Sequence, residues 1–168
     1  MRRAWDRRTG VFASGPGRVR GRLCLPISAT ENAYLFGAIC PKRGTGAALM
    51  LPKVNTHAMQ LHVDEISKYV ARKAHAVVLM DRAGWHRAGD LEVPKNLTII
   101  LLPSRSPELN PVENVWQYLR ANFLSNRVFE SYEAILDAGC DAWNQLIDRP
   151  DVITSIGMRK WAHENVGQ

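Results

Sequence analysis

The sequence predicts a mixed α/β domain built around a central β-sheet. Two kinds of segment carry this prediction: short apolar runs bounded by turn residues, and longer segments whose apolar residues recur every three or four positions. They follow one another as strand, strand, helix, strand, strand, helix and helix. At 168 residues the chain suits a single domain with a sizeable core.

The composition argues against several classes of protein. Hydrophobic residues make up 46% of the chain and charged residues 23%, as in ordinary globular proteins. No apolar run approaches the ~20 residues that a membrane span needs, and no signal peptide opens the chain. Cys24, Cys40 and Cys140 are widely spaced and form no CxxC pair, which argues against a disulfide scaffold and a thiolate zinc site. We therefore expect a cytoplasmic protein with no membrane partner.

The positive charge is concentrated at the start of the chain. Residues 1–28 hold seven arginines and one acidic residue, Asp6, whereas the remaining residues hold 15 basic and 15 acidic groups. Glycine and proline are frequent in this segment and no periodicity is present. We therefore interpret residues 1–28 as a basic, poorly ordered leader and residues 29–168 as the folded domain. An arginine-rich arm can grip phosphates, but it can equally act as a solubilising leader, and the sequence favours neither.

A β-hairpin and a helix are expected to open the folded domain. Apolar runs at 34–39 and 47–51 are predicted strands, and turn residues at 41–46 join them as a hairpin. Asn55 or Thr56 is expected to cap a helix that ends near position 70. Its apolar residues recur at helical spacing and predict one buried stripe, formed by Met59, Val63, Ile66 and Val70.

A second pair of strands and three helices follow. The run at about 75–80 is apolar along its length, as expected of a central strand covered on both faces, and the run at 97–102 ends at a proline. Helices are predicted from Pro111, over about 131–147, and over a short segment near 156–163. The inward stripes of the first two are formed by Val112, Val115, Trp116, Leu119 and Phe123, and by Ile135, Ala138, Ala142 and Leu146.

Asp81 comes directly after the apolar run of a predicted central strand. Its side chain is therefore expected to emerge at the edge of the sheet where ligands bind in open α/β folds. The simpler alternative is an aspartate that starts a loop or forms an Asx-turn. Arg82 follows in the same loop and could contact a phosphate. His86 lies near the same edge, but an ordinary surface position explains it better than a ligand role.

Glu113 lies in the first turn of the helix that begins near Pro111. Asn110, Pro111 and Glu113 form a capping-box pattern, and capping alone would explain this glutamate. The two roles are compatible, because a capping residue at a cleft edge can also bind a ligand. A strand-end and a helix-start carboxylate are suitable ligands for Mg²⁺ or Mn²⁺, and such a pair suits phosphoryl transfer.

Two motifs at these residues resemble a known family. Residues 78–86 read VLMDRAGWH, and residues 103–116 read PSRSPELNPVENVW. The second string is highly specific, and together they are similar to the catalytic domain of DDE-type transposases, in the bacterial insertion-sequence branch of the mariner-like superfamily. The resemblance covers roughly residues 33–163.

The resemblance implies a fold, an activity and partners. The expected fold is ribonuclease H-like, with a mixed central sheet flanked by helices. The expected activity is metal-dependent DNA cleavage and strand transfer with Mg²⁺ or Mn²⁺, in which Asp81 is the second metal-binding acid and Glu113 the third. The implied partners are DNA, as element ends and as target, and a second copy of the chain in a homodimer. The implied location is the bacterial cytoplasm, at the nucleoid.

One departure from the family concerns the first acid. In the family it lies on the first strand of the sheet, and residues 1–28 offer only Asp6, in arginine- and glycine-rich surroundings. We therefore expect a sheet that lacks its first strand and a domain that is inactive alone, completed by an upstream-frame transposase portion or left as a gene remnant. The alternative function is a non-catalytic DNA-binding or dimerisation module. A third alternative, a ribonuclease H-like nuclease of another kind, would need a third acid in the cleft, for which the candidates are Asp64, Glu65 and Asp141.

Overall fold

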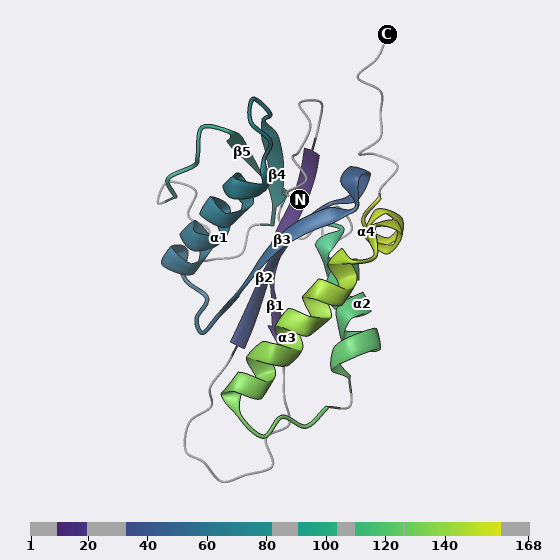
Figure 1. Ribbon diagram of the computed structural model, residues 1–168. Coiled ribbons are helices and arrows are strands. Elements are labelled where there is room, and N and C mark those ends of the chain that lie inside the picture. The colour runs from purple at the N-terminus through teal and green to yellow at the C-terminus, as the bar shows by residue number, and fades with distance from the viewer. Residues whose placement is uncertain (1–9, 20–32, 82–90, 104–109, 126, 159–168) are drawn as a thin grey trace.

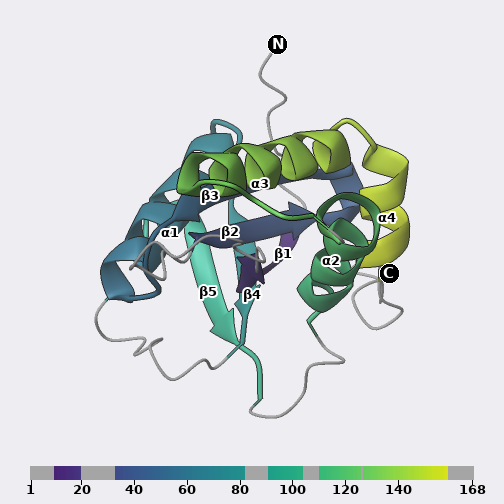
Figure 2. The ribbon, with the colours of Figure 1, turned by 90° about the horizontal axis from the view of Figure 1, so that it is seen from below.

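The computed structural model of the chain describes residues 10–19, 33–81, 91–103, 110–125 and 127–158. Within these residues a five-stranded sheet is covered by helices on both faces (Figures 1 and 2). The mixed α/β order expected from the sequence is therefore confirmed. None of the described helices is long and apolar enough to cross a membrane.

The described strands form one mixed sheet in the order β3-β2-β1-β4-β5. Strands β1, β2 and β3 pair in antiparallel fashion, whereas β4 runs parallel to β1 and β5 parallel to β4. Because β1, β4 and β5 are parallel, their carboxyl ends meet at one edge of the sheet. The strand bounds are β1 Gly10–Val19, β2 Ala33–Cys40, β3 Thr45–Leu51, β4 Ala76–Met80 and β5 Leu97–Leu101.

The expectation that the sheet lacks its first strand is wrong, because β1 lies in its middle, between β2 and β4. This strand falls within the predicted poorly ordered leader, of which residues 1–9 and 20–32 lie outside the described residues. Its glycines and proline give it little strand propensity of its own. Strands β2 and β4 are both apolar, however, and each would leave an unpaired edge without β1. Pairing on both sides therefore orders a segment whose composition alone predicts no strand.

The predicted hairpin and first helix are confirmed. Strands β2 and β3 are joined by a short 3₁₀ helix, η1 (Pro41–Arg43), and by Gly44, whose φ of 57° favours glycine. Helix α1 (Thr56–Tyr69) begins where the Asn55 side chain accepts a hydrogen bond of 2.8 Å from the amide of Ala58. Its buried face includes Met59, Val63 and Ile66 of the predicted stripe, whereas Val70 follows the helix as its C-cap residue.

The first described core lies between α1 and one face of the sheet. Alternate residues of β2 and β4 point toward the helix, and they are almost completely buried. One buried residue of α1 is polar: His62 is 0% exposed and contacts the ring of Phe36, with 5.9 Å between the ring centroids. This core is formed mainly by Phe36, Ala38, Cys40, Met59, Val63, Ile66, Ala76, Val78 and Met80.

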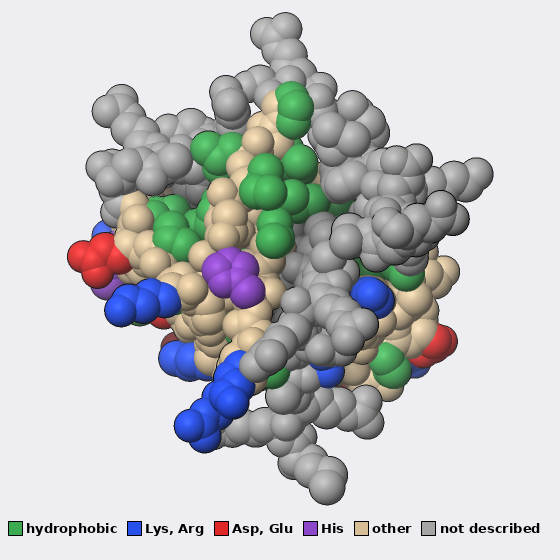
Figure 3. Space-filling model, turned by 90° about the horizontal axis from the view of Figure 1, so that it is seen from above, with side chains coloured by type: hydrophobic (Ala, Val, Ile, Leu, Met, Phe, Trp, Pro, Cys, Tyr) green, Lys and Arg blue, Asp and Glu red, His purple; other side chains and the backbone are tan. Residues whose placement is uncertain are grey.

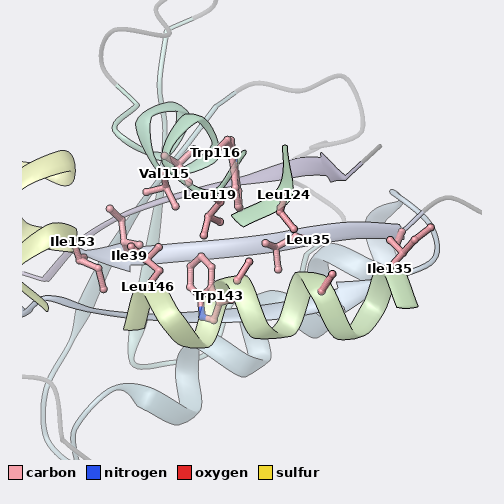
Figure 4. Packing of buried hydrophobic residues seen from close by; sticks show 14 of the residues in the cluster. Leu35, Ile39, Val115, Trp116, Leu119, Leu124, Ile135, Trp143, Leu146 and Ile153 are labelled. Atoms are coloured by element: carbon pink, nitrogen blue, oxygen red, sulfur yellow. The ribbon is translucent and has the colours of Figure 1, made fainter. Parts of the chain in front are cut away.

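The second described core lies on the opposite face of the sheet, under α2 (Val112–Leu119), α3 (Tyr132–Ile147) and α4 (Pro150–Gly157). Two tryptophans, Trp116 and Trp143, pack over β2 in its centre (Figure 4). They leave no room above Gly37, where an added Cβ would lie 2.8 Å from Cη2 of Trp116 and 2.8 Å from Cζ3 of Trp143.

The three later helices agree with the sequence except at their ends. Helix α2 carries the predicted buried stripe and continues into a π-helical turn, η3 (Arg120–Leu124), which contains the less buried Phe123. Helix α3 is capped by Ser131, whose Oγ accepts a hydrogen bond of 3.1 Å from the amide of Ala134. The last helix, expected near 156–163, instead begins at Pro150, because proline is well suited to the first position of a helix. Positions 159–163 lie outside the described residues.

Candidate active site

Asp81 lies where the sequence predicted it, directly after the last residue of β4. It sits at the edge where the parallel strands β1, β4 and β5 end, and a hydrogen bond of 2.7 Å from the amide of Leu102 to the carbonyl of Met80 extends the β4–β5 pairing there. Met80 is buried against α1, so the alternation of the strand directs Asp81 to the opposite face, on which α2 lies. The Asp81 carboxyl is half-buried.

Glu113 lies in the first turn of α2 and is exposed. The start of this helix is fixed by Asn110, which is buried: its Oδ1 accepts a hydrogen bond of 3.1 Å from the amide of Val112, and its carbonyl accepts one of 3.4 Å from the amide of Glu113. The predicted cap by Asn110 is thus present, whereas the Glu113 carboxylate makes no hydrogen bond to a residue that the structure describes. Among the described residues, the Glu113 carboxylate therefore takes no part in capping the helix.

The negative charge of Glu113 acts on the carboxyl group of Asp81. Burial raises the pKa of Asp81 above its ordinary value, and the negative charge of Glu113 raises this pKa further. Thirty-two positions separate the two residues in the sequence, so the fold brings them together at the edge of the sheet. Like charges at such a site are relieved by protonation or by a bound cation.

The chemistry of this pair fits one divalent cation. Mg²⁺ is held in proteins by one or two carboxylates, with waters and substrate phosphates completing its coordination. Within the described residues no group of three or more histidine, cysteine, aspartate or glutamate side chains could hold a metal ion. Asp81 and Glu113 could together hold such an ion, and within the described part of the chain no third carboxylate joins them.

The other acids considered from the sequence lie elsewhere or outside the described residues. Asp64 accepts a hydrogen bond of 2.9 Å from Nε2 of Gln60, and Glu65 forms an ion pair of 2.7 Å with Lys68. Asp141 is exposed on α3. The remaining candidates, Asp6, Arg82 and His86, lie outside the residues that the structure describes.

Sequence reasoning missed the strand that runs beside Asp81. Ser14 of β1 pairs with Met80, so Gly15 is the β1 residue level with Asp81. The segment from Gly10 to Val19 contains no acidic residue, so this neighbouring strand adds no carboxylate to the site. The signal that could have revealed the strand is the short apolar run Val11-Phe12-Ala13, which the surrounding glycines and arginines conceal.

Comparison with known proteins gives concordant matches. A family model for the DDE superfamily endonucleases matches residues 13–136. An uncharacterized protein of Sinorhizobium fredii is 56% identical over 133 residues, which is 79% of this chain and 98% of that protein. The Tc3 transposable-element transposase of Caenorhabditis elegans is 25% identical over 125 residues, 70% of this chain and 38% of the transposase.

A solved structure confirms the fold class. The crystal structure of the Mos1 strand transfer complex matches with a TM-score of 0.53 and 15% sequence identity, over 89% of this chain and 55% of that chain. The ribonuclease H-like fold expected from the sequence is therefore present. The chain spans about half of the Mos1 chain and less than half of the Tc3 transposase. With a family model that covers most of its length, the chain belongs to the DDE superfamily endonucleases.

Proposed function

We propose that this chain is the catalytic domain of a transposase that cuts DNA and joins it to a target with the help of a divalent metal ion. The observation that carries the proposal is the pair formed by Asp81 and Glu113 at the carboxyl edge of the parallel strands, where burial and the negative charge of Glu113 raise the pKa of Asp81. Family membership supports it, because both residues fall within the segment, residues 13–136, that the family model matches.

Asp81 and Glu113 would hold the cation, which we expect to be Mg²⁺ or Mn²⁺. When bound, such an ion supplies positive charge to a phosphate and favours ionisation of water at neutral pH. The two residues are held in place by different elements of the fold. Asp81 is fixed by the end of β4, whereas Glu113 is carried by a helix whose buried stripe and Asn110 cap set its position. Their shared negative charge favours a cation and disfavours a phosphate bound without one.

We further propose that the domain alone cuts DNA poorly, because two ions usually need three or more carboxylates. The strand level with Asp81 presents Gly15 at the corresponding position, which supports this view. An upstream portion of the transposase or a second copy of the chain would then complete the site. Nicking of a supercoiled plasmid tests the proposal: purified chain with Mg²⁺ or Mn²⁺ should give no nicking above that of Glu113→Gln. Robust cleavage that Glu113→Gln abolishes would show that the domain is complete.

A second candidate function is a non-catalytic DNA-binding or dimerising module. It is favoured by the same site, because the described residues offer two carboxylates where two metal ions usually need three or more. It predicts that the double variant Asp81→Asn with Glu113→Gln binds DNA as well as the unaltered chain. It also predicts that adding the upstream portion restores no cleavage. Cleavage by the completed protein, lost in Glu113→Gln, would rule this module out.

A further inference from the structure

Asn114 joins the first turn of α2 to the last turn of α4. Its Nδ2 donates a hydrogen bond of 3.0 Å to the carbonyl of Ile156, 42 positions later in the chain. The two helices lie side by side (Figures 1 and 2). Because Asn114 directly follows Glu113, this hydrogen bond acts on the part of α2 that carries the candidate metal ligand.

Helix α4 is itself fixed to the turn of the β2–β3 hairpin. Oγ1 of Thr154 donates a hydrogen bond of 2.7 Å to the carbonyl of Pro41, in the turn η1. Gly157 leaves no room for a side chain, because an added Cβ would lie 2.6 Å from Cγ of Pro41 and 2.7 Å from Cδ1 of Ile39. The carbonyl that accepts from Asn114 therefore belongs to a helix whose place is set by the hairpin.

The other contacts of α2 leave its rotation less well defined. The Asn110 cap is local, because it joins residues two positions apart. The buried side of the helix is apolar, and the hydrophobic effect has no preferred direction. At the far end of α2, Nη1 of Arg149 lies 3.3 Å from Oη of Tyr118, in an exposed contact remote from Glu113. The half-buried Asn114 thus supplies the directional contact at the first turn.

Small rotations of α2 would displace the Glu113 carboxylate appreciably. The tip of a helical side chain lies ~5 Å from the helix axis, so a rotation of about 10° moves it by ~1 Å. Distances between a metal ion and its ligands are held within about 0.2 Å. A hydrogen bond that restricts the rotation of α2 therefore bears on whether Glu113 can share a cation with Asp81.

We propose that Asn114 is a positioning residue for Glu113: through its hydrogen bond to α4 it sets the distance between the Glu113 carboxylate and Asp81. This role rests on the proposed function in one respect, because it takes the two carboxylates to hold one divalent cation. Metal affinity then depends on how α4 sits against the hairpin turn, which contains neither candidate ligand.

A pair of matched variants tests this role. Asn114→Leu removes the hydrogen bond and keeps a branched side chain of similar size. Asn122→Leu is the control, because Nδ2 of Asn122 donates over 2.8 Å to the carbonyl of Tyr118, four residues earlier in the same helical segment. Mn²⁺ binding is followed by the paramagnetic resonance signal of the free ion. Asn114→Leu should bind Mn²⁺ at least ~10-fold more weakly than the unaltered chain, and Asn122→Leu should change the affinity by less than ~2-fold.

Thr154→Val tests the same connection from the side of α4. It removes the hydroxyl that bonds to Pro41 and leaves Asn114 intact. It should also weaken Mn²⁺ binding, by ~3-fold or more, because α4 then no longer presents the carbonyl of Ile156 at a fixed place. Combined with Asn114→Leu it should cause no further loss, since both changes act through one contact. Losses that multiply in the double variant would overturn the positioning role.

A distance measurement separates this role from the proposed function, because it needs no metal. Nitroxide labels are attached at Gln117→Cys on α2 and at Lys95→Cys before β5, both exposed positions, with Cys24→Ser and Cys140→Ser in the background and the buried Cys40 left in place. Figure 3 shows Lys and Arg side chains standing clear of the surface, as such a label requires. Double electron–electron resonance should show a mean distance that shifts by ~1 Å or more, or a broader distribution, in Asn114→Leu but not in Asn122→Leu.

Weaker Mn²⁺ binding and a changed distance in Asn114→Leu support the positioning role. An unchanged distance, unchanged affinity in a chain that otherwise binds Mn²⁺, or an equal loss in Asn122→Leu would each overturn it. A lower melting temperature alone would then identify Asn114 as a residue that only stabilises the fold. If the unaltered chain binds no Mn²⁺ but the distance still changes in Asn114→Leu, the proposed function fails and the positioning of α2 by Asn114 stands.

Discussion

His62 should make the folded chain sensitive to acid. It lies in the core between α1 and the sheet, 0% exposed, with its ring against Phe36. Burial lowers the pKa of His62 to about 3, and the backbone of Gly37 opposes this shift only in part. In the unfolded chain the same group titrates near 6.5.

The sign and size of the effect follow from these two pKa values. Between pH 6.5 and pH 3 the unfolded chain binds a proton at His62 and the folded chain does not, so stability falls as the pH is lowered through this window. The stability that uncharged His62 contributes to the folded chain is fully present above about pH 6.5, the pKa of His62 in the unfolded chain. At pH 5 the loss is about 2 kcal/mol, and below pH 3 it approaches an upper limit of about 5 kcal/mol.

Urea unfolding followed by tryptophan fluorescence at pH 7.5 and pH 5 measures the effect. The unaltered chain should lose about 2 kcal/mol more than His62→Leu between these pH values. His57→Leu provides the matched control, because His57 is exposed on the same helix, and it should keep the pH dependence of the unaltered chain. If His62→Leu and the unaltered chain lose the same free energy of unfolding, or if His62 titrates near its ordinary pKa, the reasoning is refuted.

Three further predictions concern packing, electrostatics and backbone strain. Gly37→Ala should lower the free energy of unfolding by about 1 to 3 kcal/mol in urea titrations, because its Cβ would overlap the rings of two tryptophans. Glu113→Gln should lower the pKa of Asp81, followed by carboxyl ¹³C NMR, because it removes one of the two causes that raise it; an unchanged pKa would mean that the carboxylates do not interact. Lys73→Gly should raise the free energy of unfolding by about 0.5 to 1 kcal/mol, because the φ of Lys73 is 69°, in the left-handed region that favours glycine, and a destabilised variant would argue against strain at this turn.

The elements with a clear hydrophobic period were predictable from the sequence. The stripe of α1, the stripe of α3 and the alternating runs of the hairpin each encode a buried face locally, so they could be placed within one or two residues. His62 could also have been found, because it lies three residues after Met59 on the same helical face.

Strand β1 could not be placed from its own residues. Its position depends on β2 and β4, which lie on either side of it and meet it only in the folded chain. The candidate site likewise has a part that the sequence predicted and a part that only the structure shows. A strand end and a helix start predicted Asp81 and Glu113 individually, whereas their electrostatic contact is a property of the packing of α2 against the sheet. The register that sets Gly15 level with Asp81 required the structure.

Joint binding of a divalent cation by Asp81 and Glu113 is the property on which the proposed active site depends most. Titration of the purified chain with Mn²⁺, followed by the loss of the free-ion paramagnetic resonance signal, measures this directly. We predict a binding site that is lost in Asp81→Asn and in Glu113→Gln, and retained in Glu65→Gln, which removes a carboxylate engaged with Lys68 instead. Affinity should also decline as the pH falls through the raised pKa of Asp81, because protons then compete for its carboxylate. Mn²⁺ binding that is unaffected by either substitution would contradict the account.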